Sequence, residues 1–275
     1  MGLREEQVEG GPEALLRAGD PEAALPALQA LVRGEPADPK LRVFLFQLLC
    51  VLGDWERAHA QLKALAELDA GSLALVHLYG PAINCELLRR EVFAGTRTPL
   101  VMGEPLPWVA LLLQALTLEA QGRGAEAKAL RADALEQAQA VAGTIDGQAF
   151  EWIADADSRL GPVCEAVIEG RYYWVPFERI RWLGLDAPEA LRDVVWIPAH
   201  LGLSNGGEAA ALLPVRYPGS ESDPDGLIRL ARKTEWAEVT PETFQGRGQR
   251  MFATDSNEHA ILSVRRIELG AVEAA

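Results

Sequence analysis

The feature that most constrains the fold is a short motif that returns at a fixed spacing near the N-terminus. Segment 19–24 (GDPEAA) recurs as segment 53–58 (GDWERA), 34 residues later. Glycine permits a tight turn, aspartate caps the helix that follows, and small alanines let neighbouring helices approach closely. Because each helix pair leaves an apolar face uncovered, such units must stack on one another. The sequence therefore predicts a stacked repeat of helix pairs.

The 34-residue period resembles that of the tetratricopeptide repeat, and a degenerate third copy begins at Gly122. Up to about Gly143, apolar residues recur every three or four positions, which is typical of amphipathic helices. The expected helices are 11–18, 21–33, 39–52, 55–68, 72–94, 106–121 and 124–142.

After segment 143–147 the pattern changes to short apolar runs separated by Gly, Pro, Asp and Asn, which favours strands and turns. We therefore predict an α+β fold with two domains: an all-α, tetratricopeptide-like helical-repeat domain over 1–143 and a β-rich domain over 144–275. The expected strands are 171–177, 194–201, 209–215, 249–253 and 260–269, the last two forming a hairpin, and a short helix is expected at 226–233.

The charge balance excludes several classes of partner. The formal net charge of −14 is spread over both halves, so no basic face is available for nucleic acid or an anionic membrane surface. No apolar run approaches the roughly 20 residues of a bilayer span, and segment 1–6 lacks the apolar core of a secretory signal. We expect a cytoplasmic protein, with its three cysteines buried as free thiols.

One local pattern points to an enzyme. Segment 202–206 (GLSNG) fits the G-x-S-x-G nucleophile elbow of serine hydrolases, with Ser204 as nucleophile and His200 as a possible base. The elbow requires a helix behind the serine, whereas the segment that follows ends early, at Pro214. A flexible turn is the competing interpretation. No phosphate-binding glycine loop and no zinc-type spacing occurs in the sequence, so we predict no cofactor and no metal site.

The densest polar cluster is segment 152–162 (WIADADSRLGP). In a strand Asp155 and Asp157 share one face, and in a turn Arg159 can pair with one of them. Three interpretations stay open. The aspartates belong to a metal or catalytic site, although the further oxygen ligands that a hard cation needs are not nearby; they form a buried structural network; or they form a partner-binding surface.

An aromatic run, segment 171–177 (RYYWVPF), follows a few residues later, and Trp182 lies close to it in sequence. Extended, this run is aromatic on both faces. It predicts either packing between sheet layers or an aromatic groove or exposed strand edge that receives a peptide from a partner.

Segments 152–162 and 170–177 together resemble the ImpE/SciE/TagJ family, accessory proteins of bacterial type VI secretion. The similarity extends to the start of the repeat at 19–23 and to segment 192–198. It implies a cytoplasmic, non-enzymatic adaptor that binds the small subunit of the contractile sheath through a helical segment of that subunit. It also implies an influence on recruitment of the ClpV-type AAA+ ATPase that disassembles contracted sheath.

The resemblance carries over no individual binding residue, so the aromatic and charged residues of these segments are the candidates that form or support the partner surface. They are Trp152, Asp155, Asp157, Arg159, Tyr172, Tyr173, Trp174 and Trp182. A further alternative is a general tetratricopeptide scaffold, in which the repeats only support a functional C-terminal domain.

Overall fold

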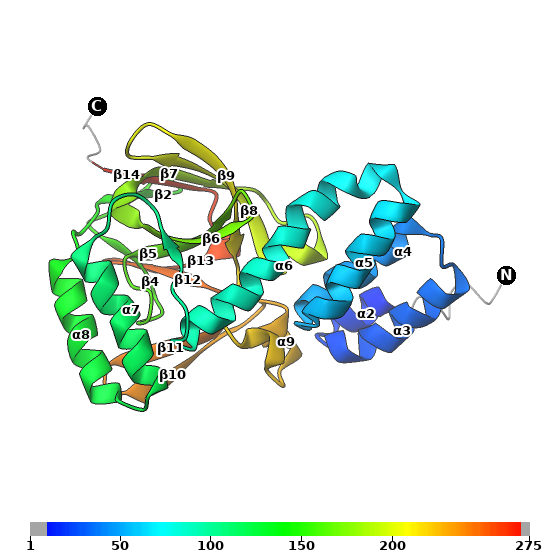
Figure 1. Cartoon of the computed structure of the whole chain (residues 1–275), viewed down its shortest axis with the longest axis horizontal. Helices are drawn as coiled ribbons and strands as arrows, with labels where there is room; N and C mark the ends of the chain where they lie inside the picture. Colours follow the sequence, from blue (N-terminus) through cyan, green and yellow to red (C-terminus); the bar gives the residue numbers. More distant parts are fainter. Residues whose placement is uncertain (1–9, 271–275) are drawn as a thin grey trace.

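The structure, a computed structural model, describes residues 10–270 and combines a helical half with a sheet-rich half (Figure 1). This confirms the predicted fold class. The helices of the first half are α2 (Pro12–Arg17), α3 (Pro21–Gly34), α4 (Pro39–Val51), α5 (Trp55–Leu68), α6 (Leu73–Phe93), α7 (Pro107–Ala120) and α8 (Gly124–Gln137).

The repeated motif builds the same turn twice. The backbone φ angles of Gly19 and Gly53 are 87° and 69°, values that residues with a Cβ rarely adopt. Asp20 then caps α3 by accepting a hydrogen bond from the Ala23 N–H at 2.9 Å, and Asp54 caps α5 in the same way. The predicted roles of glycine and aspartate in the repeat are confirmed.

The sheet-rich half contains a nine-stranded sheet in the order β1-β6-β5-β9-β8-β7-β14-β2-β3, a three-stranded sheet β13-β12-β4 and the two-stranded β10-β11. The strands are β1 (Leu100–Val101), β2 (Gly143–Ile145), β3 (Gln148–Phe150), β4 (Ile153–Asp155), β5 (Val163–Ile168), β6 (Arg171–Pro176), β7 (Ile180–Leu185), β8 (Trp196–Leu203), β9 (Glu208–Pro214), β10 (Thr234–Thr240), β11 (Thr243–Gly248), β12 (Met251–Thr254), β13 (Glu258–Ala260) and β14 (Arg266–Leu269). A short helix, α9 (Gly226–Arg229), precedes β10.

The nine-stranded sheet separates two hydrophobic cores. Along β5, Val163 and Val167 belong to the core shared with the helices, whereas Ala166 and Ile168 belong to the core on the other face. Every residue of β5 is buried, as expected for a strand covered on both faces. The helical repeat therefore shares the first of these two cores with one face of the sheet.

Helices α7 and α8 lie beside the β10-β11 hairpin, away from α2–α5 (Figure 1). Lys128 on α8 pairs with Glu242 at 2.9 Å, and Gln245 of β11 donates to Glu119 of α7. Apart from β1, which lies between α6 and α7 and pairs with β6, the chain changes from helices to strands at Gly143, where β2 begins. Independent folding of 1–143 stays a prediction.

One face of α4 is covered by the chain itself. A single 3-10 turn, η3 (Leu191–Val194), lies against α4, and the Arg192 N–H donates to Gln47 Oε1 at 3.3 Å. Arg192 Nε donates to the Tyr79 hydroxyl at 2.9 Å, with its guanidinium over the tyrosine ring. This face of the repeat is therefore already occupied.

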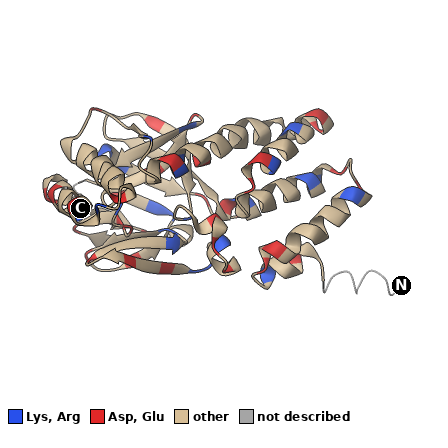
Figure 2. Ribbon diagram, turned by 60° about the horizontal axis from the view of Figure 1, so that its bottom comes forward, with Lys and Arg blue, Asp and Glu red and all other residues tan. Residues whose placement is uncertain are grey.

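Charged residues of both signs are interspersed along the helices and strands (Figure 2). Within residues 10–270, no helix combines the length and the apolar character needed to cross a membrane.

Several predicted elements differ from the structure. The helix predicted over 124–142 ends at Gln137, because Ala138 turns to an extended conformation. The single strand predicted over 260–269 is wrong: β13 pairs with β12 as the predicted hairpin, but a turn over 261–263 then moves the chain into the larger sheet as β14. Strands β1–β5, β7, β10 and β11 were not predicted.

Arg216 joins the end of the repeat to the sheet-rich half. Its Nη1 donates to Val51 O at 2.7 Å, and its Nη2 donates at 3.2 Å to Cys50 O, which also accepts the Gly53 N–H; carbonyls of the last turn of α4 thus gain a charged donor. We predict that Arg216→Met lowers the free energy of unfolding by about 3 kcal/mol, because buried carbonyls lose a charged donor. Urea denaturation measures this. Arg97→Met, at an exposed arginine, is the control and should change it by less than about 0.5 kcal/mol; equal effects would contradict the prediction.

Candidate functional site

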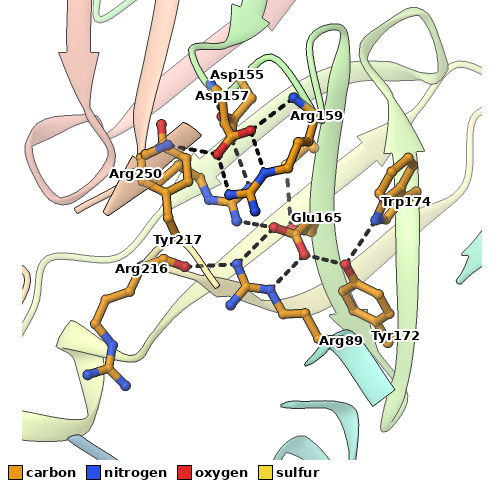
Figure 3. Close-up of polar contacts among 12 residues, drawn as sticks. Arg89, Asp155, Asp157, Arg159, Glu165, Tyr172, Trp174, Arg216, Tyr217 and Arg250 are labelled. Atoms are coloured by element: carbon orange, nitrogen blue, oxygen red, sulfur yellow. Dashed lines mark hydrogen bonds and ion pairs between the residues drawn. The ribbon is translucent and has the colours of Figure 1, made fainter. Parts of the chain in front are cut away.

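A buried network of ion pairs is centred on Glu165, in the middle of β5 (Figure 3). The Glu165 side chain is fully buried, and its carboxylate accepts from Arg89 Nε at 2.7 Å and from Arg89 Nη2 at 2.9 Å. Arg250 Nη2 and the Tyr172 hydroxyl donate to the same carboxylate. Two guanidinium groups thus surround one buried carboxylate, and such pairing is the condition under which charges persist in an interior of low dielectric constant.

The D-x-D pattern continues the network from Arg250. Arg250 Nη1 donates to Asp155 Oδ2 at 2.9 Å, and Asp155 Oδ1 accepts from the Asp157 N–H at 2.8 Å. The Arg159 guanidinium donates two hydrogen bonds to the Asp157 carboxylate, at 2.8 and 2.6 Å. The Gly246 N–H donates to Asp157 Oδ2 at 2.9 Å. Of the three interpretations of this pattern, the structure shows the buried network. Within residues 10–270, no group of three or more His, Cys, Asp or Glu side chains is placed to hold a metal ion.

The network draws together segments that are far apart in sequence. Arg89 comes from α6, Glu165 from β5, and Arg250 from the residue before β12. Arg89 also donates to Arg216 O at 2.8 Å, which links the network to the arginine that caps α4. The helical half and both larger sheets therefore meet at this point.

Burial and charge shift the pKa values of the network in opposite directions. Burial alone raises the pKa of Glu165, but Arg89 and Arg250 outweigh it and hold the pKa well below the usual value. Burial raises the pKa of Asp155 to about 7, because the attraction of Arg250 and the hydrogen bond from the Asp157 N–H compensate only partly. The pKa of Tyr172 is raised by burial and by Glu165, so the tyrosine stays a hydrogen-bond donor.

The predicted site residues fall into three groups by burial. Those that are buried are Asp155, Asp157, Arg159, Tyr172 and Trp174. Trp174 Nε1 donates to the Tyr172 hydroxyl at 2.9 Å, so the aromatic run supports the network from β6. Tyr173 and Trp182 are half-buried, and the Arg266 guanidinium stacks on Trp182 at 4.3 Å. Trp152 alone among the eight is exposed, at 40%.

Trp152 lies at a groove of about 480 Å³ between α8 and segment 152–162. Leu135 of α8 lines the groove from the other side and is 48% exposed, and Arg131, one turn earlier on α8, lines the same side. Reasoning from the sequence missed these two residues together with Arg89, Glu165 and Arg250. A lone acidic residue within an apolar run, as in VCEAVI at 163–168, was the available signal for Glu165.

The hydrolase hypothesis fails on geometry. Ser204 lies in the tight turn between β8 and β9, which are paired antiparallel strands, so a strand rather than a helix follows it. Gly206, with φ of 87°, permits this turn, and the Ser204 N–H donates to Arg179 O at 2.9 Å. The predicted elbow at Ser204 and His200 is therefore wrong.

Comparison with known proteins agrees with this architecture. The chain is 50% identical to the type VI secretion system accessory component TagJ of Pseudomonas aeruginosa, over 95% of this chain and 92% of that protein. The chain belongs to the ImpE/TagJ family. Residues 147–268 match the family described as ImpE protein, and residues 15–78 match the tetratricopeptide repeat. The crystal structure of protein VPA1032 from Vibrio parahaemolyticus has the same fold, with a TM-score of 0.87 at 22% identity, covering 94% of this chain and 97% of that one.

Removing the charge at the centre of the network should destabilise the protein strongly. We predict that Glu165→Gln lowers the free energy of unfolding by about 3–5 kcal/mol, because Arg89 and Arg250 then lose their shared buried counter-charge. Thermal and urea unfolding measure this. The same substitution at exposed Glu242 should cost less than about 0.5 kcal/mol. A loss below about 1 kcal/mol for Glu165→Gln would contradict the account.

The raised pKa of Asp155 predicts a pH dependence. Because folding raises this pKa from 3.8 to about 7, Asp155 contributes stability that is complete below about pH 4 and is lost as the pH rises through 7. The free energy of unfolding of the wild type relative to Asp155→Asn should therefore fall between about pH 4 and pH 7. Urea titrations of both proteins across this range test it. If the free energy of unfolding of the wild type relative to Asp155→Asn rose with pH instead, the attraction of Arg250 would outweigh the effect of burial on the pKa of Asp155.

Proposed function

We propose that this chain is a cytoplasmic, non-enzymatic adaptor of a bacterial type VI secretion system. It binds the small subunit of the contractile sheath through a helical segment of that subunit, and thereby influences recruitment of the ClpV-type AAA+ ATPase. The observation that carries the proposal is the 50% identity, over 95% of the chain, to a type VI secretion system accessory component. Identity at this level over nearly all of both proteins makes a shared role the first expectation.

Three features of the structure support an adaptor. The charged residues of the central network are paired with one another and buried, which suits a rigid scaffold. The remaining sequence-based candidate for catalysis, Ser204, lies in a hairpin turn. A stacked helical repeat is also a common framework for protein recognition.

Binding to the purified small sheath subunit tests the proposal. The full chain is titrated with fluorescently labelled subunit from the same gene cluster, and we expect saturable, stoichiometric binding without turnover of the subunit. The large sheath subunit alone serves as the specificity control. Absence of binding to the small subunit at micromolar concentrations would contradict the proposal.

A second measurement tests the ClpV-type ATPase. Pull-down of the ATPase on immobilised sheath subunits should change in yield when the full chain is added. An unchanged yield at saturating chain would leave sheath binding in place and overturn the role in recruitment.

A further inference from the structure

The groove between α8 and segment 152–162 has one helical wall. Lys128, Arg131 and Leu135 line it and recur at the spacing of a single face of α8. Leu135 is apolar and about half exposed. A single exposed leucine is ordinary, but this one faces an exposed tryptophan across a hollow.

The second wall is the outward side of segment 152–162. Ala154 and Ala156 line the groove, while Asp155 and Asp157 are engaged in the buried network. The backbone of β4 is not free to pair with an added strand. All three residues of β4 pair with β12 along one edge, and on the other edge the Asp155 N–H already donates to Gly161 O at 2.7 Å. An occupant must therefore bind through side chains, as a helix does, rather than by adding a strand.

A buried donor lines the groove. Arg131 is only 5% exposed; its Nη2 pairs with Glu119, whereas its Nε has no hydrogen-bond partner among the described residues. A buried guanidinium N–H left without an acceptor costs about 1–3 kcal/mol or more. An incoming carboxylate would supply that acceptor, and the Lys128 ammonium, which pairs with Glu242 at 2.9 Å, lies at the rim of the same groove.

We propose that this groove docks an amphipathic helix of a partner protein. The helix places an apolar side chain between Leu135 and Trp152 and an Asp or Glu carboxylate toward Arg131. The inference rests on the proposed function, with the small sheath subunit as the protein that carries the helix. Lys128 and Glu242 form an ion pair at the rim, so a substitution of either residue changes the net charge that the groove presents to the helix.

Apolar substitutions test the contact. The probe is fluorescently labelled small sheath subunit, titrated with the full chain. We expect Trp152→Ala and Leu135→Glu each to weaken binding about tenfold or more, as loss of a central apolar anchor does. The matched control is Leu31→Glu on α3, a leucine of similar exposure at 43%, which should leave the affinity within about twofold. Thermal unfolding of each variant confirms that it is folded.

Charge substitutions test the acidic character of the occupant and predict opposite signs. Lys128→Glu should weaken binding about threefold to tenfold, whereas Glu242→Lys should tighten it severalfold, because the rim then carries two positive charges. Both effects should shrink at 0.5 M salt. Effects of the reverse sign would overturn the acidic occupant.

The outcomes separate the two proposals. Wild-type binding with unchanged affinity for Trp152→Ala and Leu135→Glu would overturn the groove and leave the adaptor function standing. No wild-type binding would overturn both. Self-association of the chain that Leu135→Glu abolishes would show that a second copy covers the groove, and would also overturn the assignment.

Discussion

The architecture depends on one buried carboxylate shared by two arginines. Glu165 lies in a strand that is covered on both faces, where an unpaired charge would be strongly destabilising. Arg89 reaches it from α6 and Arg250 from the start of β12, so the charge is neutralised only when the helices, the large sheet and the small sheet are all in place. The network therefore penalises any other arrangement of these parts. Removing one charged partner lowers the free energy of unfolding by more than the intact network contributes to it, because the remaining charge is left buried and unpaired.

The segment 152–162 has two roles because its residues face two ways. Asp155, Asp157 and Arg159 face inward and join the network, whereas Trp152 borders the groove beside α8. The network holds the backbone that presents the outward residues. If a substitution of an inward-facing residue abolished binding, the cause would therefore be a displaced groove and not the loss of a direct contact with the partner. The buried Tyr172 belongs with this supporting group, since its hydroxyl donates to the central carboxylate.

Local patterns predicted the helices well, because the repeat start at Gly53 and Asp54 and the spacing of apolar residues are visible within a few residues. The strands were predicted less well. The turn at 261–263, which moves the chain between sheets, carries no distinctive residue. The pairing of Arg89 with Glu165 spans 76 residues and no local rule predicts it.

The D-x-D pattern was recognised as important, but only burial separates a structural network from a binding surface. The groove requires α8 and β4 to be placed together, which the sequence does not reveal.

The central claim is that the outward side of segment 152–162 and α8 form the partner-binding surface on a scaffold held by the inward side. Hydrogen exchange of the full chain, with and without saturating small sheath subunit, tests it most directly. The account predicts slower exchange in the amides of α8 and of residues 152–156 on binding, with unchanged exchange in α4 and η3, which already cover each other. Protection confined to α2–α5, with α8 unchanged, would contradict it.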